Sequence, residues 1–341
     1  MRGIAALAVL VEHGGYHFLR GFAAFTHSLF SFGKFGLTCF FLVSGFVIPF
    51  SLEGRPGLKR FWVLRIFRLY PIYWFSLFSA LILYRLGLKD VLTPEFLSHF
   101  TRNAIVNVSM LQGIVMLPHA IGLYYTLTIE MLFYGICTVL IWRNWLRQSY
   151  LICWLVLILA SSISLGVPLL LHRRVEMAGL FYIVTLAVGA TLYRVYLGEV
   201  SRKAFTTLTV CVGLFVCAGV WFNYLLNKKD DVFEHYTFAA VVLPWAAAYV
   251  LFIAMLALPH LKCPRMLLWV GRISYSLYLL HPLVLSFFRV REGNILGFFV
   301  FTGLSLLVAS CTYLLIEKPA MRLGQQLLAR QAPRTVSVLA N

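Results

Sequence analysis

The chain has 341 residues, of which 61% are hydrophobic and 12% are charged. Soluble domains carry about one quarter charged residues and under half apolar residues, so this composition excludes an ordinary soluble domain. The formal net charge of +17 does not indicate a nucleic-acid-binding protein, because the Lys and Arg residues lie in short clusters between long apolar runs. Such clusters are typical of loops that face the cytoplasm and anionic lipid head groups. We therefore expect an all-α, polytopic membrane protein.

Ten apolar runs are long enough to cross the hydrocarbon core, which is about 30 Å thick, as helices. They cover roughly residues 2–19, 32–52, 69–86, 121–142, 150–171, 177–196, 204–226, 237–258, 268–288 and 295–316. The segment 96–117 is too polar to span, since it contains Arg102, Asn103 and Asn107, and we expect a re-entrant or surface helix there. The seven cysteines are isolated and lack metal-binding spacing, which indicates buried thiols and no metal site.

The positive charges predict the orientation in the membrane. With the N-terminus in the cytoplasm, the segments on the cytoplasmic side hold most of the Lys and Arg residues, as such segments usually do. An even number of spans also places the basic end of the chain in the cytoplasm. We therefore predict about ten transmembrane helices with both termini cytoplasmic, a membrane domain over residues 1–320 and a basic cytoplasmic tail over residues 321–341.

The first apolar run contains two ionisable residues, Arg2 and His13, which are eleven positions apart. Ionisable residues are costly inside a membrane and are therefore candidates for function. This spacing places both on one face of a helix, about 16 Å apart along its axis. Arg2 then lies at the cytoplasmic head groups, where a guanidinium suits phosphate, and His13 lies near mid-membrane, where it could act as a general base. The alternative is a histidine that only hydrogen-bonds to a neighbouring helix. Glu12, on another face, is interpreted as a helix-pairing residue.

Three further groups of candidate residues follow along the chain. Ser44 and Gly45, within FFLVSGFVI, would let another helix or a ligand approach the backbone closely. Arg65 and Arg68 share a helix face and could clamp a phosphate, although they would serve equally well as positive anchors at the cytoplasmic surface. Glu130 lies inside the fourth run and needs a partner, which could be His13, an arginine or a proton.

Taken together and in order, these segments resemble the acyltransferase-3 family. MRGIAALAVLVEH resembles its R-X10-H signature, with Arg2 and His13, and RIFRLYPIYW resembles its R-X2-R-X2-P motif, with Arg65, Arg68 and Pro71. GLTCFFLVSGFVI, NVSMLQ followed by YYTLTIEMLFY, RISYSLYLLHPLV and YLLIEKP are similar to its other blocks, with Glu130 at the family's glutamate.

The sequence departs from the family pattern in three places. Thr38 stands near the family's acidic residue in the second helix, and Tyr125 stands where a tryptophan is usual. The family also has several residues before its first arginine, whereas this sequence begins at Arg2, so we expect the natural start to lie upstream of Met1.

The resemblance implies a multi-pass enzyme of the bacterial cytoplasmic membrane. Such an enzyme transfers an acyl group, most often acetyl, from cytoplasmic acyl-CoA to a hydroxyl of an extracytoplasmic glycan or related acceptor, without a permanently bound cofactor. By the same resemblance, His13 would deprotonate the acceptor or carry the acyl group, and Glu130 would orient or charge-balance the catalytic site. Arg2, Arg65 and Arg68 would bind the donor, with Ser44 and Gly45 beside it. Residues 145–260 carry no motif, and we expect the acceptor to be chosen there.

Two other classes of protein fit some of these features. A proton-coupled secondary transporter would also carry intramembrane His, Glu and Arg, but such carriers often contain inverted repeats, and residues 2–142 do not pair with residues 177–316 in this way. A structural or assembly partner with a degenerate site is the second alternative. The presence of the motif residues argues against it.

Overall fold

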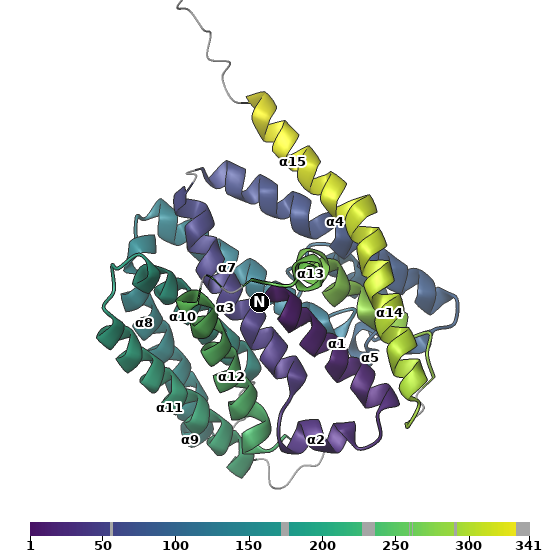
Figure 1. The fold of residues 1–341 in the computed structure, drawn as a ribbon, viewed down its shortest axis with the longest axis horizontal. Coiled ribbons are helices and arrows are strands. Elements are labelled where there is room, and N and C mark those ends of the chain that lie inside the picture. The colour runs from purple at the N-terminus through teal and green to yellow at the C-terminus, as the bar shows by residue number, and fades with distance from the viewer. Residues whose placement is uncertain are drawn as a thin grey trace, which may run out of the picture.

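A computed structural model describes residues 1–54, 57–171, 177–226, 236–258, 260, 262–289 and 292–331. These residues form helices joined by turns, and none of them lies in a β-strand (Figure 1). The α-helices are α1 (Arg2–Phe18), α2 (Phe22–Ser28), α3 (Phe32–Gly54), α4 (Leu58–Arg85), α5 (Pro94–Leu97), α6 (Phe100–Asn107), α7 (Tyr125–Trp142), α8 (Ser149–Ser161), α9 (Val167–Leu171), α10 (Met177–Tyr196), α11 (Arg202–Leu226), α12 (Phe238–Ala257), α13 (Arg265–Leu285), α14 (Ile295–Thr312) and α15 (Lys318–Gln331). The short helical turns are η1 (Lys89–Val91), η2 (Gly122–Tyr124), η3 (Leu146–Gln148), η4 (Ser162–Gly166) and η5 (Tyr313–Glu317).

Every predicted apolar run contains a helix, and most helix ends fall within a few residues of the prediction. The largest difference is α4, which begins at Leu58, whereas the apolar run begins at residue 69. No proline or glycine interrupts residues 58–70, so the basic segment before the run continues the helix. Residues 96–117 contain only the ends of α5 and the short helix α6, which is too short to span, as expected.

Among the described residues, eight helical segments are long and apolar enough to cross a membrane: Phe32–Glu53, Leu58–Arg85, Gly122–Trp142, Leu146–Gly166, Ala178–Tyr196, Arg202–Phe222, Phe238–Ala257 and Ile295–Arg330. This confirms an all-helical, multi-pass membrane protein. Helices α1 and α13 coincide with the other two predicted spans but lie outside this set, since α1 has only 17 residues and α13 carries Arg265, Arg272 and His281. The count of ten spans therefore stays a prediction.

Helices α1 and α13 lie in the middle of the bundle, where Figure 1 shows α13 nearly end-on beside the N-terminus. Helices α8, α10, α11 and α12 stand on one side of them, and α4, α14 and α15 on the other (Figure 1). Close approach at the centre depends on glycine. A Cβ atom at Gly36 of α3 would lie 2.6 Å from the carbonyl oxygen of Ala5, and one at Gly3 would lie 2.5 Å from that of Leu267 in α13. The helices that carry most of the candidate residues thus touch backbone to backbone.

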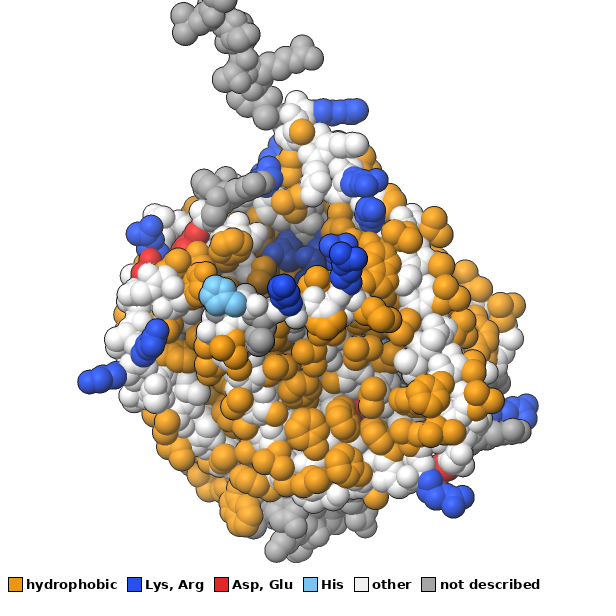
Figure 2. All heavy atoms as spheres, in the orientation of Figure 1, with side chains coloured by type: hydrophobic (Ala, Val, Ile, Leu, Met, Phe, Trp, Pro, Cys, Tyr) orange, Lys and Arg blue, Asp and Glu red, His pale blue; other side chains and the backbone are white. Residues whose placement is uncertain are grey.

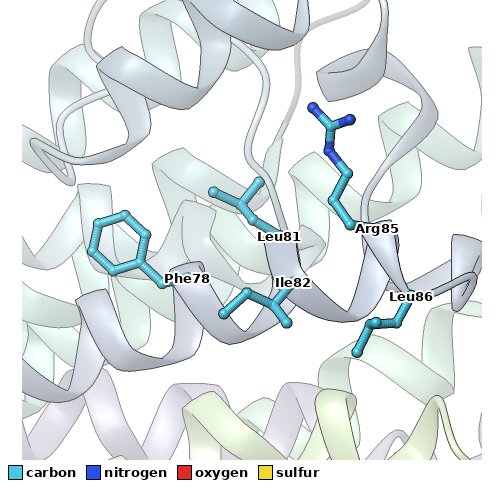
Figure 3. A pocket seen from close by; sticks show the side chains of 5 residues that line it. All are labelled: Phe78, Leu81, Ile82, Arg85 and Leu86. Carbon is cyan, nitrogen blue, oxygen red and sulfur yellow. The ribbon is translucent and has the colours of Figure 1, made fainter.

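The outer surface of the described bundle is largely apolar, as a surface that faces lipid must be (Figure 2). One shallow groove of 480 Å³ follows α4 and is lined by Phe78, Leu81, Ile82, Arg85 and Leu86 (Figure 3). Its one charged group, the Arg85 guanidinium, turns toward the ring of Phe100, at 5.4 Å from the centroid. The predicted site residues line no part of this groove, because they lie inside the bundle.

Candidate active site

Two histidines from helices far apart in the sequence meet inside the bundle. Nδ1 of His13 in α1 lies 2.8 Å from Nε2 of His281 in α13. The two rings are nearly parallel, with planes inclined by 20° and centroids 5.0 Å apart, so the two nitrogens meet edge to edge. Nδ1 of His281 lies 2.9 Å from the carbonyl oxygen of Leu277 in its own helix. His281 is 1% exposed, whereas His13 is half-buried, so His13 is the more accessible member of the pair.

His281 was not among the residues predicted to form the site. A signal for it exists in the sequence, because His281 is a second histidine within an apolar run, in the RISYSLYLLHPLV block. Sequence reasoning could not pair it with His13, since the two residues are 268 positions apart. Pro282 adds a local reason for its position. Proline donates no backbone hydrogen bond, so the helical ladder is interrupted next to His281.

The three candidate arginines gather at the start of α1. The charges of Arg68 and Arg65 both act on Arg2, together with that of Glu130. Nε of Arg2 is buried and has no hydrogen-bond partner among the described residues. Figure 2 shows Lys and Arg side chains within a hollow near α4, close to the N-terminus marked in Figure 1. An arginine whose buried Nε–H has no partner among the described residues, next to two more arginines, is suited to bind an anion such as phosphate.

Glu130 lies at this arginine end. Its Oε1 accepts hydrogen bonds from the Ser44 hydroxyl, at 3.1 Å, and from the Tyr134 hydroxyl. The guanidinium of Arg65 lies over the Tyr134 ring, 5.2 Å from its centroid. Of the partners considered from sequence, the structure thus places arginines near Glu130, and no contact with His13 occurs within the described residues. Glu130 therefore lies with the arginines at the start of α1.

A second carboxylate, not predicted from the sequence, faces the same arginines. The π-helical turn η5 turns Glu317 inward, where it is 1% exposed and accepts a 2.6 Å hydrogen bond from the Ser276 hydroxyl of α13. The charges of Arg68 and Arg2 both act on it. The arginine cluster, defined as Arg2, Arg65 and Arg68, is therefore flanked by two carboxylates on different helices.

Two other candidate residues have structural roles. A Cβ atom at Gly45 would lie 2.2 Å from the carbonyl oxygen of Leu186 in α10, so Gly45 permits helix packing, the first of the two roles considered for it. Glu12 accepts hydrogen bonds from the Ser31 hydroxyl at 2.7 Å, the Phe32 backbone N–H at 2.9 Å and the Tyr16 hydroxyl at 3.0 Å. Its carboxylate caps the N-terminus of α3 and pairs α1 with α3, as interpreted from sequence.

Helix α1 therefore has a cationic end and a histidine end. The spacing of Arg2 and His13 separates the two by about 16 Å along the axis. One end offers positive charge for anionic groups, and the other offers a histidine pair that could take part in acid–base chemistry.

Comparison with known proteins identifies the family of the chain. A family model described as an acyltransferase domain matches residues 1–315, and the chain belongs to this family of membrane acyltransferases, the acyltransferase-3 family. The chain is also similar to nodulation protein 10 of Rhizobium leguminosarum bv. viciae. The two are 24% identical over 325 residues, which cover 87% of this chain and 84% of that protein. No solved structure matches the chain.

Proposed function

We propose that this membrane acyltransferase moves an acyl group, most readily acetyl, from cytoplasmic acyl-CoA to a hydroxyl group of an extracytoplasmic glycan or related acceptor. The observation that carries the proposal is the polarity of α1. One end holds Arg2, with a buried and unpaired N–H, among two further arginines, and the other end holds a half-buried histidine that contacts a second histidine.

Acyl-CoA has the shape that this polarity requires. Its phosphates lie at one end and its thioester at the end of a long flexible arm, so that binding and chemistry take place far apart. The arginine cluster would hold the phosphates through charge-assisted hydrogen bonds. The arm would then run along α1 toward His13, and Glu130 and Glu317 would balance the arginine charges while no donor is bound.

His13 is the proposed catalytic base. The acceptor hydroxyl would approach His13 from the half-buried side and lose its proton as its oxygen bonds to the thioester carbonyl carbon. The C–S bond then breaks, and the sulfur takes up the proton. Intramembrane His, Glu and Arg also fit a transporter, but membership of an acyltransferase family favours transfer chemistry for these residues.

The proposal is tested with purified protein in proteoliposomes that receive acetyl-CoA, and with surface glycans from cells with and without the protein. Mass spectrometry should detect acetylated glycan only where wild-type protein is present. His13→Gln keeps hydrogen bonding but accepts no proton at neutral pH, and general-base assistance contributes about 10²–10⁴ in rate, so this variant should nearly abolish transfer. Donor binding should persist, because the phosphates are held at the other end. Normal transfer by well-folded His13→Gln protein would contradict the proposal.

A further inference from the structure

His281 determines which nitrogen of His13 is free. The argument begins at the carbonyl oxygen of Leu277, which can only accept a hydrogen bond. His281 Nδ1 lies 2.9 Å from this oxygen and must therefore carry a proton. If the His281 ring is neutral, its Nε2 has a lone pair and no proton.

A neutral His281 is expected from its surroundings. The residue is 1% exposed, and a buried charge without a partner is costly. Within the described part of the chain, His281 contacts His13 of α1 and Leu277 and Tyr278 of its own helix, and no carboxylate hydrogen-bonds to it. Among the described residues, no hydrogen-bonded carboxylate therefore compensates a protonated ring.

The proton between the two rings then belongs to His13. A hydrogen bond of 2.8 Å between two ring nitrogens needs one proton, and Nε2 of His281 has none to give. Nδ1 of His13 is accordingly the donor. Because a neutral imidazole has one N–H, Nε2 of His13 is left with the lone pair.

We propose that His281 is a positioning residue, which fixes His13 in the tautomer with its proton on Nδ1 and leaves Nε2 as the base that receives the acceptor's proton. The inference rests on the proposed function and adds His281 to its machinery. As the acceptor oxygen bonds to the thioester carbon, its proton passes to Nε2 of His13 and makes that ring an imidazolium. When the C–S bond breaks, the leaving sulfur takes this proton back, and the protons of His281 do not move.

The edge-to-edge contact of the two rings offers a substitution that separates this role from packing. His281→Phe keeps a ring against His13 but removes the acceptor nitrogen. His281→Gln places an amide oxygen where it can accept from Nδ1 of His13. The assay is acetyl-CoA cleavage by purified protein, followed as released thiol, with water and a panel of neutral oligosaccharides as acceptors.

We expect His281→Phe to lower kcat by about 10²-fold, the lower end of what general-base assistance contributes, with an unchanged KM for acetyl-CoA. His281→Gln should restore at least a tenth of wild-type kcat, since it restores the hydrogen-bond acceptor. Leu283→Ala is the packing control. Leu283 is buried on the same helix, so this variant should melt at a lower temperature but keep the kcat of its folded fraction.

Two results would overturn the inference. One is a wild-type kcat in folded His281→Phe protein, and the other is an equal loss in His281→Phe and His281→Gln while both bind acetyl-CoA. If His281→Phe does not fold, His281→Leu takes its place, with the same expected loss of kcat and the same contradicting outcomes. Absence of any acyl transfer by the wild-type protein would refute the proposed function itself. This outcome is distinguishable from the other two, because in those the wild-type protein is active.

Discussion

At the scale of single residues, the arginine cluster indicates most clearly which chemical group a ligand must carry. Arg2 has a buried N–H without a partner, and an unmade hydrogen bond from a buried charged group is energetically costly. Arg65 lies instead over the rings of Phe61 and Tyr134, which fixes its position. The protein's own side chains thus hold part of the cluster in place, and a bound phosphate would supply a hydrogen-bond acceptor for Arg2.

Arg68→Ala should weaken the binding of CoA. A hydrogen bond to a charged group contributes about 1.5–3 kcal/mol, which corresponds to about 10- to 100-fold in Kd. Lys should restore only part of the affinity, because an ammonium lacks the two-pronged geometry of a guanidinium. Titration calorimetry in detergent measures the effect, with Arg85→Ala as the control, since the exposed Arg85 lies on the same helix away from the site. Wild-type affinity in folded Arg68→Ala protein would leave Arg68 as a topological anchor only.

Glu317→Gln should change CoA affinity in the opposite direction. The carboxylate of Glu317 lies in the field of Arg68 and Arg2 and would repel donor phosphates, while a glutamine can still bond to the Ser276 hydroxyl. Removing this charge should therefore tighten CoA binding. We expect the Kd to fall by up to about fivefold, which is the size typical of an interaction between partly screened charges. The same calorimetric titration measures it. Weaker binding would show that Glu317 orients the arginines more than it repels the ligand.

At the scale of helices, the contact between α3 and α10 determines where Ser44 stands. Gly45 meets the backbone of α10 at Leu186, and a Cβ atom at Gly189 would in turn lie 2.5 Å from the carbonyl oxygen of Leu42. Because Ser44 is adjacent to Gly45, this reciprocal contact fixes the rotation of α3 that aims the Ser44 hydroxyl at Glu130. Packing and site geometry are thus coupled through one pair of glycines.

Gly45→Ala should lower stability by about 1–3 kcal/mol, because the added Cβ must displace backbone atoms and cannot simply rotate away. Gly135→Ala in α7 is the matched control. A Cβ atom at Gly135 would meet no other atom within 4 Å, so this change should be neutral or stabilising, by up to about 1 kcal/mol. Thermal melting of both purified variants measures the difference. Equal melting temperatures would mean that α3 and α10 separate at little cost.

The helices were largely predictable from the sequence, whereas the site was predictable only in part. Long apolar runs predict helices because lipid offers no hydrogen-bond partner to the backbone N–H and C=O groups, which must therefore bond to one another. The Arg2 and His13 pair was predictable because both lie on one helix with a known repeat. The places of His281 and Glu317 in the site were not predictable, since they depend on tertiary contacts. For Glu317 they also depend on a π-helical turn that no local sequence pattern predicts.

At the scale of the whole molecule, contacts between chain segments show which helix ends share a side. Arg194 near the end of α10 is fully buried and forms ion pairs with Glu53 and Glu199. It also donates a hydrogen bond to the carbonyl oxygen of Leu146. The ends of α3 and α10 therefore lie beside the turn that precedes α8. At the other end of the bundle, the Gly293 N–H donates to the Phe18 carbonyl. These groupings agree with the predicted cytoplasmic and outer segments, although the absolute orientation stays a prediction.

The same contacts support a transmembrane path for α1 and α13. Helix α1 meets the beginning of α13 at Gly3, and its last residue, Phe18, meets the loop that follows α13. Both helices thus run alongside the eight hydropathic segments from one end to the other. His281 is tolerated there because neighbouring helices, and not lipid, surround it, whereas Arg265 and Arg272 are exposed in the first half of α13. The two predicted spans that hydropathy recognises least well are therefore the two that carry the histidine pair.

The absolute orientation is testable with one of the protein's own exposed thiols. Cys263 is exposed and precedes α13 on the side predicted to be cytoplasmic, whereas Glu95 is exposed in α5 on the side predicted to be outer. In a variant that retains only Cys263, a membrane-impermeant maleimide should label inside-out vesicles and spare intact cells. Glu95→Cys in a cysteine-free background should show the reverse, because five predicted spans separate the two positions. The excess of Lys and Arg on the Cys263 side is the physical cause of this orientation. Labelling of both positions from the same side would contradict the odd number of spans predicted between them. If the two labelling patterns were exchanged, the topology would be inverted. The arginine cluster would then lie outside, out of reach of cytoplasmic acyl-CoA.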